Sequence, residues 1–527
     1  MSVEDNNVKN ISKNTAIMSI AVFCSRILGL VRDQVMAAFF GTTFVNDAFN
    51  IAFNIPNLLR RLFGEGALSS AFVPIYNEYG LKRGKKFQLH FALNMLSILT
   101  FILMILTFLG MVFTPVIVRL LYPGSDAETV DLAVRLCRLM YPYLFFIGLS
   151  STFIAILNSH NVFFITGLSS GLLNIGWMLM LVVGYFILNK ESEDLVLYAG
   201  YGVLLGGFLQ TVINLPFLKK VGYNFKIILR FKTIAMQTLW KRFLPAMFGM
   251  GVREINLLAS ALIASFLPVG SISALGFGNR LMQLPLGIFG VSVGTAALPE
   301  YSRLVTEKKW DDLSKALNFS MLLILYILLP ITVVMMIGSE IFVRLLFERG
   351  EFGENAVQMT KLALMWFSAG LCFYGWNQVI TPIFFAFKDT KTPVKIGAYI
   401  VGLNIVLSVV LMQFMAHAGI AFATSLTAMV NFIALLYLIP KKFPEVKVVG
   451  FNKNALKMCF VFTLMSVVLL MFVKVYTATG FWELLLKCVL FLLLALITAI
   501  CGFHFTKPDY YKDVVNKVLK RFLRKRS

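Results

Sequence analysis

Charged residues are scarce in this chain of 527 residues: they make up 14% of it, and aspartate and glutamate together number only 26. Soluble globular domains average about 25% charged residues, so the composition argues against a soluble protein. The 4 histidines do not cluster, and the 6 cysteines form no CxxC pair. We therefore expect no metal site, no disulfide framework and no cofactor.

Long apolar segments make up most of the chain. The chain is 58% hydrophobic and its mean hydropathy is +0.80. Apolar runs of about 20 residues, long enough to cross a bilayer, recur along it. They predict an all-α polytopic membrane protein with about fourteen transmembrane helices. The predicted segments cover residues 14–38, 44–67, 89–113, 136–157, 162–187, 197–217, 243–267, 272–297, 316–338, 358–386, 394–414, 419–439, 456–474 and 480–503.

Basic residues are unevenly shared among the loops between these segments. Lysine and arginine gather in alternate loops, such as 82–86, 219–232 and 441–453, whereas intervening loops, such as 41–47 and 123–131, are neutral or acidic. By the positive-inside rule, both termini are cytoplasmic. Membrane orientation thereby accounts for the net charge of +22, and we expect no nucleic acid as a partner.

The two halves of the chain resemble each other at a spacing of roughly 225 to 230 residues. Three pairs of segments carry the resemblance: "AFVPIYNEY" at 71–79 with "AALPEYSRL" at 296–304, "ALN" at 92–94 and again at 316–318, and "GLLNIG" at 171–176 with "VGLNIV" at 401–406. Chance similarity among apolar segments is the alternative. A parallel repeat is typical of transporters that bind substrate between two halves.

We therefore expect two pseudo-symmetric six-helix lobes around a central cavity, followed by two further helices and a basic tail. The predicted boundaries are 1–220 for the N-lobe, 221–440 for the C-lobe, 441–505 for the last two helices and 506–527 for the tail. Valines and leucines alternate with lysines in the tail, which predicts an amphipathic helix on the cytoplasmic membrane surface.

A polar stripe runs along the second predicted helix. Its members are three or four residues apart and so share one helix face: Asp47, Asn50, Asn54, Asn57, Arg61 and Glu65. Charged side chains are costly in hydrocarbon, so the stripe must face protein or water.

Arginines outnumber acids in the first two helices of each predicted lobe. The arginines are Arg26, Arg32, Arg60, Arg61, Arg253 and Arg280, and the acids are Asp33, Asp47, Glu65 and Glu254. Internal ion pairs, for instance Arg61 with Glu65 at i,i+4, explain part of this charge. The surplus guanidinium groups favour a cavity for an anion, above all phosphate, which arginine binds in bidentate fashion.

Four sequence blocks point to a known family. "SRILGLVRDQVMAAFFG", "NDAFNIAFNIPNLLRRLFGEGALSSAFVPIYNEY", "GNRLMQLPLGIFGVSVGTAALPEYS" and "DTKTPVKIG" together resemble the lipid II flippase family of peptidoglycan synthesis (MurJ, also called MviN). This family belongs to the multidrug/oligosaccharidyl-lipid/polysaccharide (MOP) exporter superfamily, and the match extends over essentially the whole chain. The resemblance implies a transporter rather than an enzyme.

The resemblance implies fourteen helices, of which the last two form a hydrophobic groove for a polyprenyl tail. It also implies alternating access, which moves lipid-linked disaccharide–pentapeptide pyrophosphate from the inner to the outer leaflet of the cytoplasmic membrane. The positions that are functionally sensitive in the family map onto Ser25, Arg26, Arg32, Asp33, Asp47, Asn57, Arg60, Glu65 and Arg280. Asn279 and Gln283 stand where some members carry acids, which puts a role for carboxylates there in doubt.

The expected roles fall into two groups. We expect the pyrophosphate and head group to be bound by Ser25, Arg26, Arg32, Asn57, Arg60 and Arg280. Gating or charge balance falls to Asp33, Asp47, Arg61, Glu65, Arg253 and Glu254. The loops 41–47 and 267–273 are expected to seal the cavity on the external side.

The driving force is left open by the sequence. A membrane potential that is negative inside assists export of an anion by about 2.3 kcal/mol per charge per 100 mV, and a coupled cation is the alternative. Asn404 and Ser408, one helical turn apart, offer neutral oxygens to sodium. We expect a monomer whose partners are lipid II and the bilayer.

Three other functions compete with this interpretation. Another exporter of the same superfamily would move a different polyprenyl-linked oligosaccharide or a drug. A membrane glycosyltransferase would need an acidic metal-binding motif in a large loop, and no loop here is long or acidic enough. A non-transporting scaffold would gain nothing from buried arginines, which are costly in a membrane.

Overall fold

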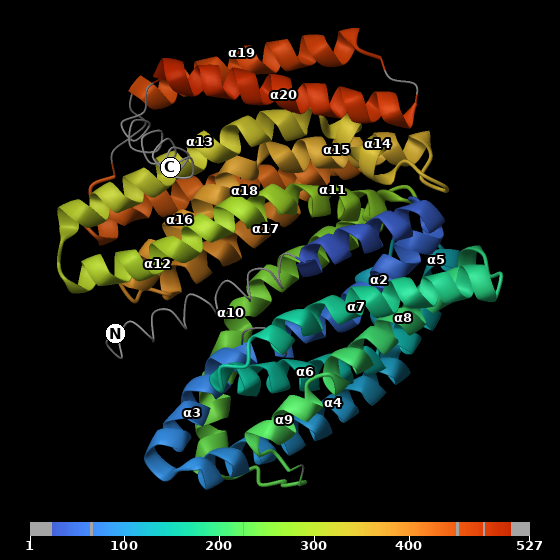
Figure 1. Ribbon diagram of the computed structural model, residues 1–527, viewed down its shortest axis with the longest axis vertical. Helices are drawn as coiled ribbons and strands as arrows, with labels where there is room; N and C mark the ends of the chain where they lie inside the picture. The colour runs from blue at the N-terminus through green and yellow to red at the C-terminus, as the bar shows by residue number, and fades with distance from the viewer. Residues whose placement is uncertain (1–23, 64–66, 225, 449–452, 478–479, 507–527) are drawn as a thin grey trace, which may run out of the picture. The chain divides into compact units, whose positions relative to one another are not determined.

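The computed structural model describes residues 24–63, 67–224, 226–448, 453–477 and 480–506. Within these ranges the regular structure is helical, without a strand, which confirms the predicted all-α class (Figure 1). Residues 24–40 form the first described helix. It is followed by α2 (Phe44–Phe63), α3 (Ala67–Arg83), α4 (Lys85–Leu121), α5 (Ala127–Met140), α6 (Pro142–Ser159), α7 (Phe164–Val182), α8 (Ser192–Val212), α9 (Leu215–Val221), α10 (Ile234–Ala264), α11 (Ser271–Pro285), α12 (Val291–Thr306), α13 (Trp310–Ile337), α14 (Ser339–Phe347), α15 (Glu354–Ala369), α16 (Leu371–Ala386), α17 (Lys391–Met415), α18 (His417–Lys442), α19 (Lys453–Val475) and α20 (Phe481–Thr506).

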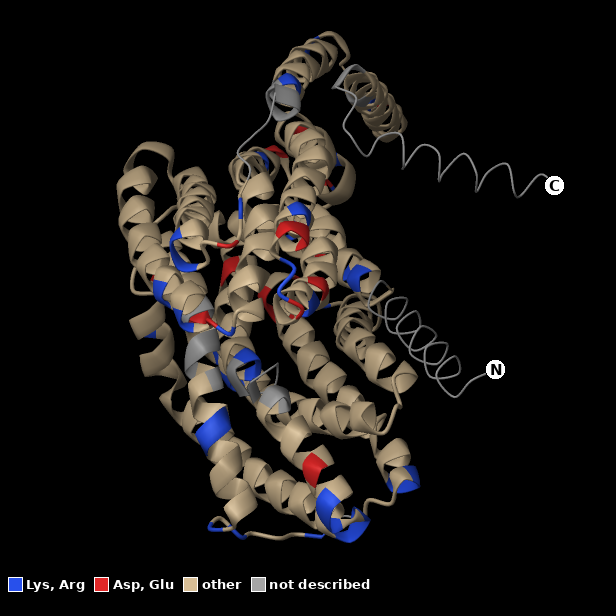
Figure 2. Ribbon diagram, turned by 90° about the vertical axis from the view of Figure 1, so that its left-hand side faces the viewer, with Lys and Arg blue, Asp and Glu red and all other residues tan. Residues whose placement is uncertain are grey.

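Every predicted apolar segment coincides, in its described residues, with a helix or a broken helix. Nine described helices are long and apolar enough to cross a membrane, and the bent pair α15–α16 makes a tenth span. The polar helix α2 is not among them, because a polar residue recurs every three or four positions along it. These spans are compatible with about fourteen crossings. Figure 2 shows how few charges lie along most of the helices.

The first of two compact units comprises Met1–Ser273 together with Arg349–Phe352. In it α2 packs against α5, α6 and α8, α7 packs against α8, and α4 packs against α3, α5 and α6. Stacked rings of Phe72, Tyr76 and Phe91 form part of the core between α3 and α4. This unit includes α10, which the sequence analysis assigned to the C-lobe. The lobe boundaries stay a prediction, because packing need not follow a sequence repeat.

The second unit comprises Ala274–Glu348 and Gly353–Ser527. Here α16 packs against α12, α13 and α18, and α17 packs against α18. The last two helices, α19 and α20, pack against each other and against α13, with Met458, Phe462 and Phe491 in their common core. The hydrophobic groove expected on these two helices stays a prediction, and the tail beyond 506 lies outside the described residues.

In each unit, an asparagine at the equivalent position of the sequence repeat forms a hydrogen bond to the main chain of a non-helical segment. Asn94 on α4 donates to the carbonyl of Arg230 at 3.0 Å and accepts from its amide at 2.8 Å. Asn318 on α13 donates to the carbonyl of Lys447 at 3.0 Å, and the Ser314 hydroxyl accepts from the Lys447 amide at 2.9 Å. Both asparagines fasten a basic, non-helical segment, which supports the repeat inferred from "ALN".

Candidate functional site

Arg32 is buried, with 6% of its surface exposed, and its guanidinium is held on three sides. Its Nε and Nη2 donate to Asp33 Oδ1 at 3.1 and 2.6 Å, and its Nη1 donates to Asn174 Oδ1 at 3.0 Å. The indole ring of Trp177 lies 4.3 Å from the guanidinium carbon, a cation–π contact. Direct pyrophosphate binding by Arg32 stays a prediction, and these contacts favour a positioning role.

Ser25 and Arg26 lie two turns earlier in the same helix. The Ser25 carbonyl accepts from Asn174 Nδ2 at 3.3 Å, so the amide of Asn174 bridges this turn and the Arg32 guanidinium. Arg26 is exposed. Of the two arginines in this helix, Arg26 is therefore the one whose side chain is open to a ligand.

Asp47 on α2 accepts hydrogen bonds from the segment that begins α11. Its Oδ2 accepts from the Gly270 amide at 2.7 Å, and its Oδ1 accepts from the Ser273 amide at 2.8 Å and the Ser273 hydroxyl at 2.5 Å. Asn50, one turn further along α2, donates to the same hydroxyl at 3.1 Å. A carboxylate at a helix N-terminus is favoured by the orphan amides and by the helix dipole. The loops 41–47 and 267–273, which the sequence paired, therefore contact each other.

Two glycines allow backbone to meet backbone around Asp47. Gly270 has φ +89°, and a Cβ there would collide with the carbonyl of Thr42. Gly41 has φ +50°, and a Cβ there would collide with the carbonyl of Glu351, whose amide donates to the Ala38 carbonyl at 2.9 Å. Three segments that are far apart in sequence thus meet at the loop 41–47; we call this contact the closed end of the first unit.

The end of α2 carries a second polar group. Arg60 Nε donates to Asn57 Oδ1 at 2.7 Å, and Asn57 is buried. Arg61 pairs with Glu254 on α10 at 3.2 Å. The alternative partner of Arg61 considered from the sequence, Glu65, lies outside the described residues.

The remaining predicted residues belong to other parts of the chain. Arg253 lies in α10, and its side chain is outside the described residues. Arg280 lies in the part of α11 that belongs to the second unit, and it is exposed. Asn404 is buried, accepts from Ser408 at 3.1 Å and donates to Thr427 at 3.0 Å. The two sodium candidates therefore bond to each other and to α18, and a sodium site stays a prediction.

Sequence reasoning missed the residues of α7 that hold Arg32. Asn174 is the asparagine of "GLLNIG", which was used only as evidence for the repeat. A signal was present, because an amide side chain inside an apolar span must find a polar partner. Which charge it would meet, 142 residues away, could not be read from local spacing.

An all-helical bundle of apolar spans, with charged side chains buried inside it, defines a multi-span membrane protein. The fold is similar to that of a solved inward-facing multidrug resistance MATE family transporter of the MOP superfamily: the TM-score is 0.68 at 14% identity, over 80% of this chain and 96% of that one. At this identity the likeness shows the fold alone.

The chain belongs to the MurJ family of lipid II flippases. The family model described as lipid II flippase MurJ matches residues 36–491. A protein of Rickettsia prowazekii named as a probable lipid II flippase MurJ is 34% identical over 504 residues, which are 95% of this chain and 97% of that protein. A relative of the same name from Buchnera aphidicola subsp. Baizongia pistaciae is 33% identical over 81% of this chain and 83% of its own length.

A solved structure described as lipid II flippase MurJ, inward closed conformation, has the same fold. It matches with a TM-score of 0.77 at 29% identity, over 94% of this chain and all of that one. The chain is therefore a multi-pass membrane protein of a transporter family and not an enzyme, as the sequence blocks implied.

Proposed function

We propose that the chain moves lipid II, a polyprenyl pyrophosphate that carries a disaccharide–pentapeptide, from the inner to the outer leaflet of the bacterial cytoplasmic membrane. The observation that carries this proposal is membership of the lipid II flippase family over nearly the whole chain. Two features of the geometry support it: an exposed arginine, Arg26, on a helix that also carries the buried Arg32 and Asp33, and a closed end built around Asp47.

The exposed arginines provide the chemistry for the pyrophosphate. Arg26 and Arg280 each present a guanidinium at the surface of their own unit, and a guanidinium matches two phosphate oxygens at once. Arg60, oriented by Asn57, is the third candidate. Arg32, held by Asp33 and α7 (with Ser25 bridged to the same asparagine), positions the first helix. The Arg61–Glu254 pair ties α2 to α10.

The closed end provides the gate of an alternating-access cycle. Asp47 holds the beginning of α11 against α2, and we assign this closed state to the external side because the loops that form it are neutral or acidic. Opening requires the carboxylate to exchange three protein donors for water. The cycle therefore moves between a state with Asp47 bonded and a state with Asp47 hydrated.

The same loop charges favour cytoplasmic termini by the positive-inside rule, and we propose that both termini lie there. We propose that the protein works as a monomer, without a bound cofactor and without nucleic acid. The membrane potential assists export of the charged head group, and a coupled cation is the second source of energy.

The test is complementation of a conditionally flippase-depleted bacterium, with lipid II on the outer surface as the readout. Wild type should restore export, and Arg26→Ala and Arg280→Ala should not. Arg303→Ala is the matched control, because Arg303 is an exposed arginine whose ion pairs, among the described residues, are with Glu300 and Glu307 at the end of the same helix. Full export by both site variants would refute the phosphate assignment. A further outcome is that wild type fails to restore lipid II export but restores growth of a strain that lacks the exporter of another polyprenyl-linked glycan. That result would favour a different exporter of the superfamily.

A further inference from the structure

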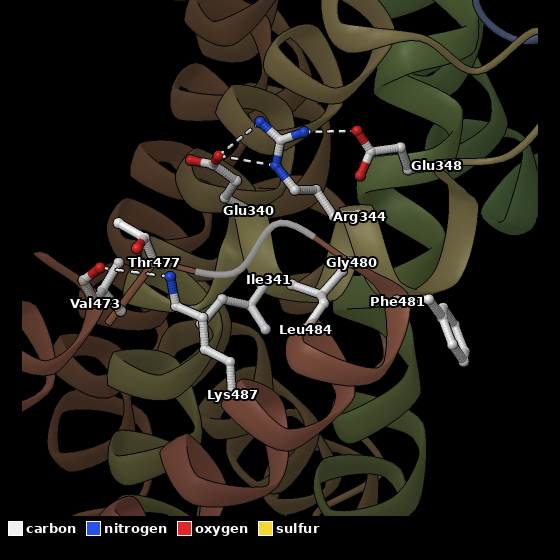
Figure 3. A pocket seen from close by; sticks show the side chains of 10 residues that line it. All are labelled: Glu340, Ile341, Arg344, Glu348, Val473, Thr477, Gly480, Phe481, Leu484 and Lys487. Carbon is white, nitrogen blue, oxygen red and sulfur yellow. Dashed lines mark hydrogen bonds and ion pairs between the residues drawn. The ribbon is translucent and has the colours of Figure 1, made fainter. Parts of the chain in front are cut away.

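A cavity of about 560 Å³ lies in the second unit, where α14 meets the end of α19 and the beginning of α20 (Figure 3). Its walls come from α14, the end of α19 and the first two turns of α20. Because α20 is long and apolar enough to cross a membrane, its first turns lie at the level of the lipid head groups.

One wall of the cavity carries Glu340, Arg344 and Glu348, which belong to a larger ionic network with Glu354 and Lys361 on α15 outside the lining. Arg344 donates to Glu340 at 3.0 Å, to Glu348 at 2.6 Å and to Glu354 at 2.7 and 2.8 Å. Lys361 adds a bond to Glu340 at 2.6 Å. Three carboxylates thus share two cations, which leaves one negative charge in excess. Glu348 has a bond to Arg344 through one oxygen, so its second oxygen can accept from a ligand.

The other wall carries a cation. Lys487 on α20 is half-buried, and its ammonium donates only a long bond of 3.5 Å to the Val473 carbonyl. Among the described residues it has no carboxylate within ion-pair distance. In Figure 3 it reaches into the cavity from the side away from Arg344 and its carboxylates. One cavity therefore offers both an excess negative charge and a separate positive charge.

We propose that this cavity binds the head group of a phospholipid that carries both a phosphate and a primary ammonium, such as phosphatidylethanolamine. The phosphate accepts from Lys487, and the ammonium donates to Glu348. Ile341, Leu484 and Phe481 line the same cavity and contact the glycerol and the upper acyl chain. This site is separate from the proposed lipid II transport and does not depend on it.

Charge complementarity selects this head group over others. An anionic lipid such as phosphatidylglycerol satisfies Lys487 but offers the excess carboxylate only neutral hydroxyl donors and no compensating positive charge. The trimethylammonium of phosphatidylcholine carries charge but no N–H, so it cannot donate to Glu348. A charge-assisted hydrogen bond in a partly buried site changes affinity by about tenfold.

The experiment measures binding of short-chain phosphatidylethanolamine, phosphatidylcholine and phosphatidylglycerol to the purified full-length protein by native mass spectrometry. Wild type should bind phosphatidylethanolamine about tenfold more tightly than phosphatidylcholine. Lys487→Gln should weaken all three lipids about tenfold, and Glu348→Gln should remove only the preference for phosphatidylethanolamine. Soluble phosphoethanolamine should bind far more weakly, because it lacks the acyl contacts.

Lys474→Gln is the matched control, since Lys474 is an exposed lysine at the end of α19. It should bind all lipids as wild type does. Lys487→Arg keeps the charge and should retain binding, which separates loss of the site from loss of folding. Equal lipid affinities for Lys487→Gln and Lys474→Gln would overturn the proposal. Tight binding of the soluble head group would overturn its assignment to a membrane lipid.

Discussion

Removing the Asp47 carboxylate should shift the gate from closed to open. Asp47 is 4% exposed and accepts three hydrogen bonds from the beginning of α11. A hydrogen bond to a charged group contributes about 1.5–3 kcal/mol. In the open state of the wild type, hydrogen bonds to water restore part of the energy that the carboxylate loses. We therefore expect Asp47→Ala to shift the equilibrium towards the open state by about 3 kcal/mol, roughly 100-fold in the equilibrium constant. Asp47→Asn keeps one acceptor and should have a smaller effect.

The assay is the rate at which a membrane-impermeant maleimide, added from outside, labels a cysteine on α2. The reporter is Asn54→Cys, two turns beyond Asp47, in a background without native cysteines. Asp194→Ala is the control, because Asp194 is an exposed carboxylate whose ion pair is with Lys190 on the same surface, so its removal should leave the Asp47 contacts unchanged. A labelling rate that is the same in Asp47→Ala and in the parent, with both proteins folded, would refute the gate.

Two further outcomes follow from side chains held by charged partners. Asn174→Ala should lower the free energy of unfolding by about 1.5–3 kcal/mol because it removes an acceptor from buried Arg32. The repeat-equivalent variant Asn404→Ala loses only hydrogen bonds between neutral groups and should lower it by about 1 kcal/mol. Unfolding in detergent measures both values, and equal losses would contradict the role of Asn174 as a partner of the Arg32 charge. Burial raises the pKa of Asp389, but the Lys442 ammonium 2.7 Å away and a neighbouring hydroxyl outweigh burial and lower this pKa to about 2. Because the carboxylate is favoured by folding, its contribution is complete above about pH 4 and is lost as the pH falls from 4 towards 2. Asp389→Asn should flatten the pH dependence of unfolding in that window, and an unchanged slope would show that the pair is not coupled to folding.

The apolar segments and the family could be predicted from sequence because both depend on local patterns. A run of about 20 apolar residues must form a helix in a bilayer, and the polar stripe of α2 had to find protein or water. The partners of that stripe could not be predicted. Arg61 pairs with Glu254, 193 residues away, and no local spacing in the sequence indicates which distant carboxylate a packed helix brings to it. The contact of residues 349–352 with Gly41 could not be predicted either, because no local sequence pattern indicates that a loop packs against a distant segment.

The closed end around Asp47 has a consequence for energy conservation in the cell. At Gly41 and Gly270 the main chains are in direct contact. No side chain of the described residues lies between them at these points, so no change of rotamer can open a path there. We expect such a closure to exclude protons and small ions as well as a bulky lipid, so that a wide pathway to one compartment need not dissipate the ion gradients of the membrane. Any larger residue at either glycine would wedge the surfaces apart, and cells that produce it should show a proton leak before they show a defect in wall synthesis.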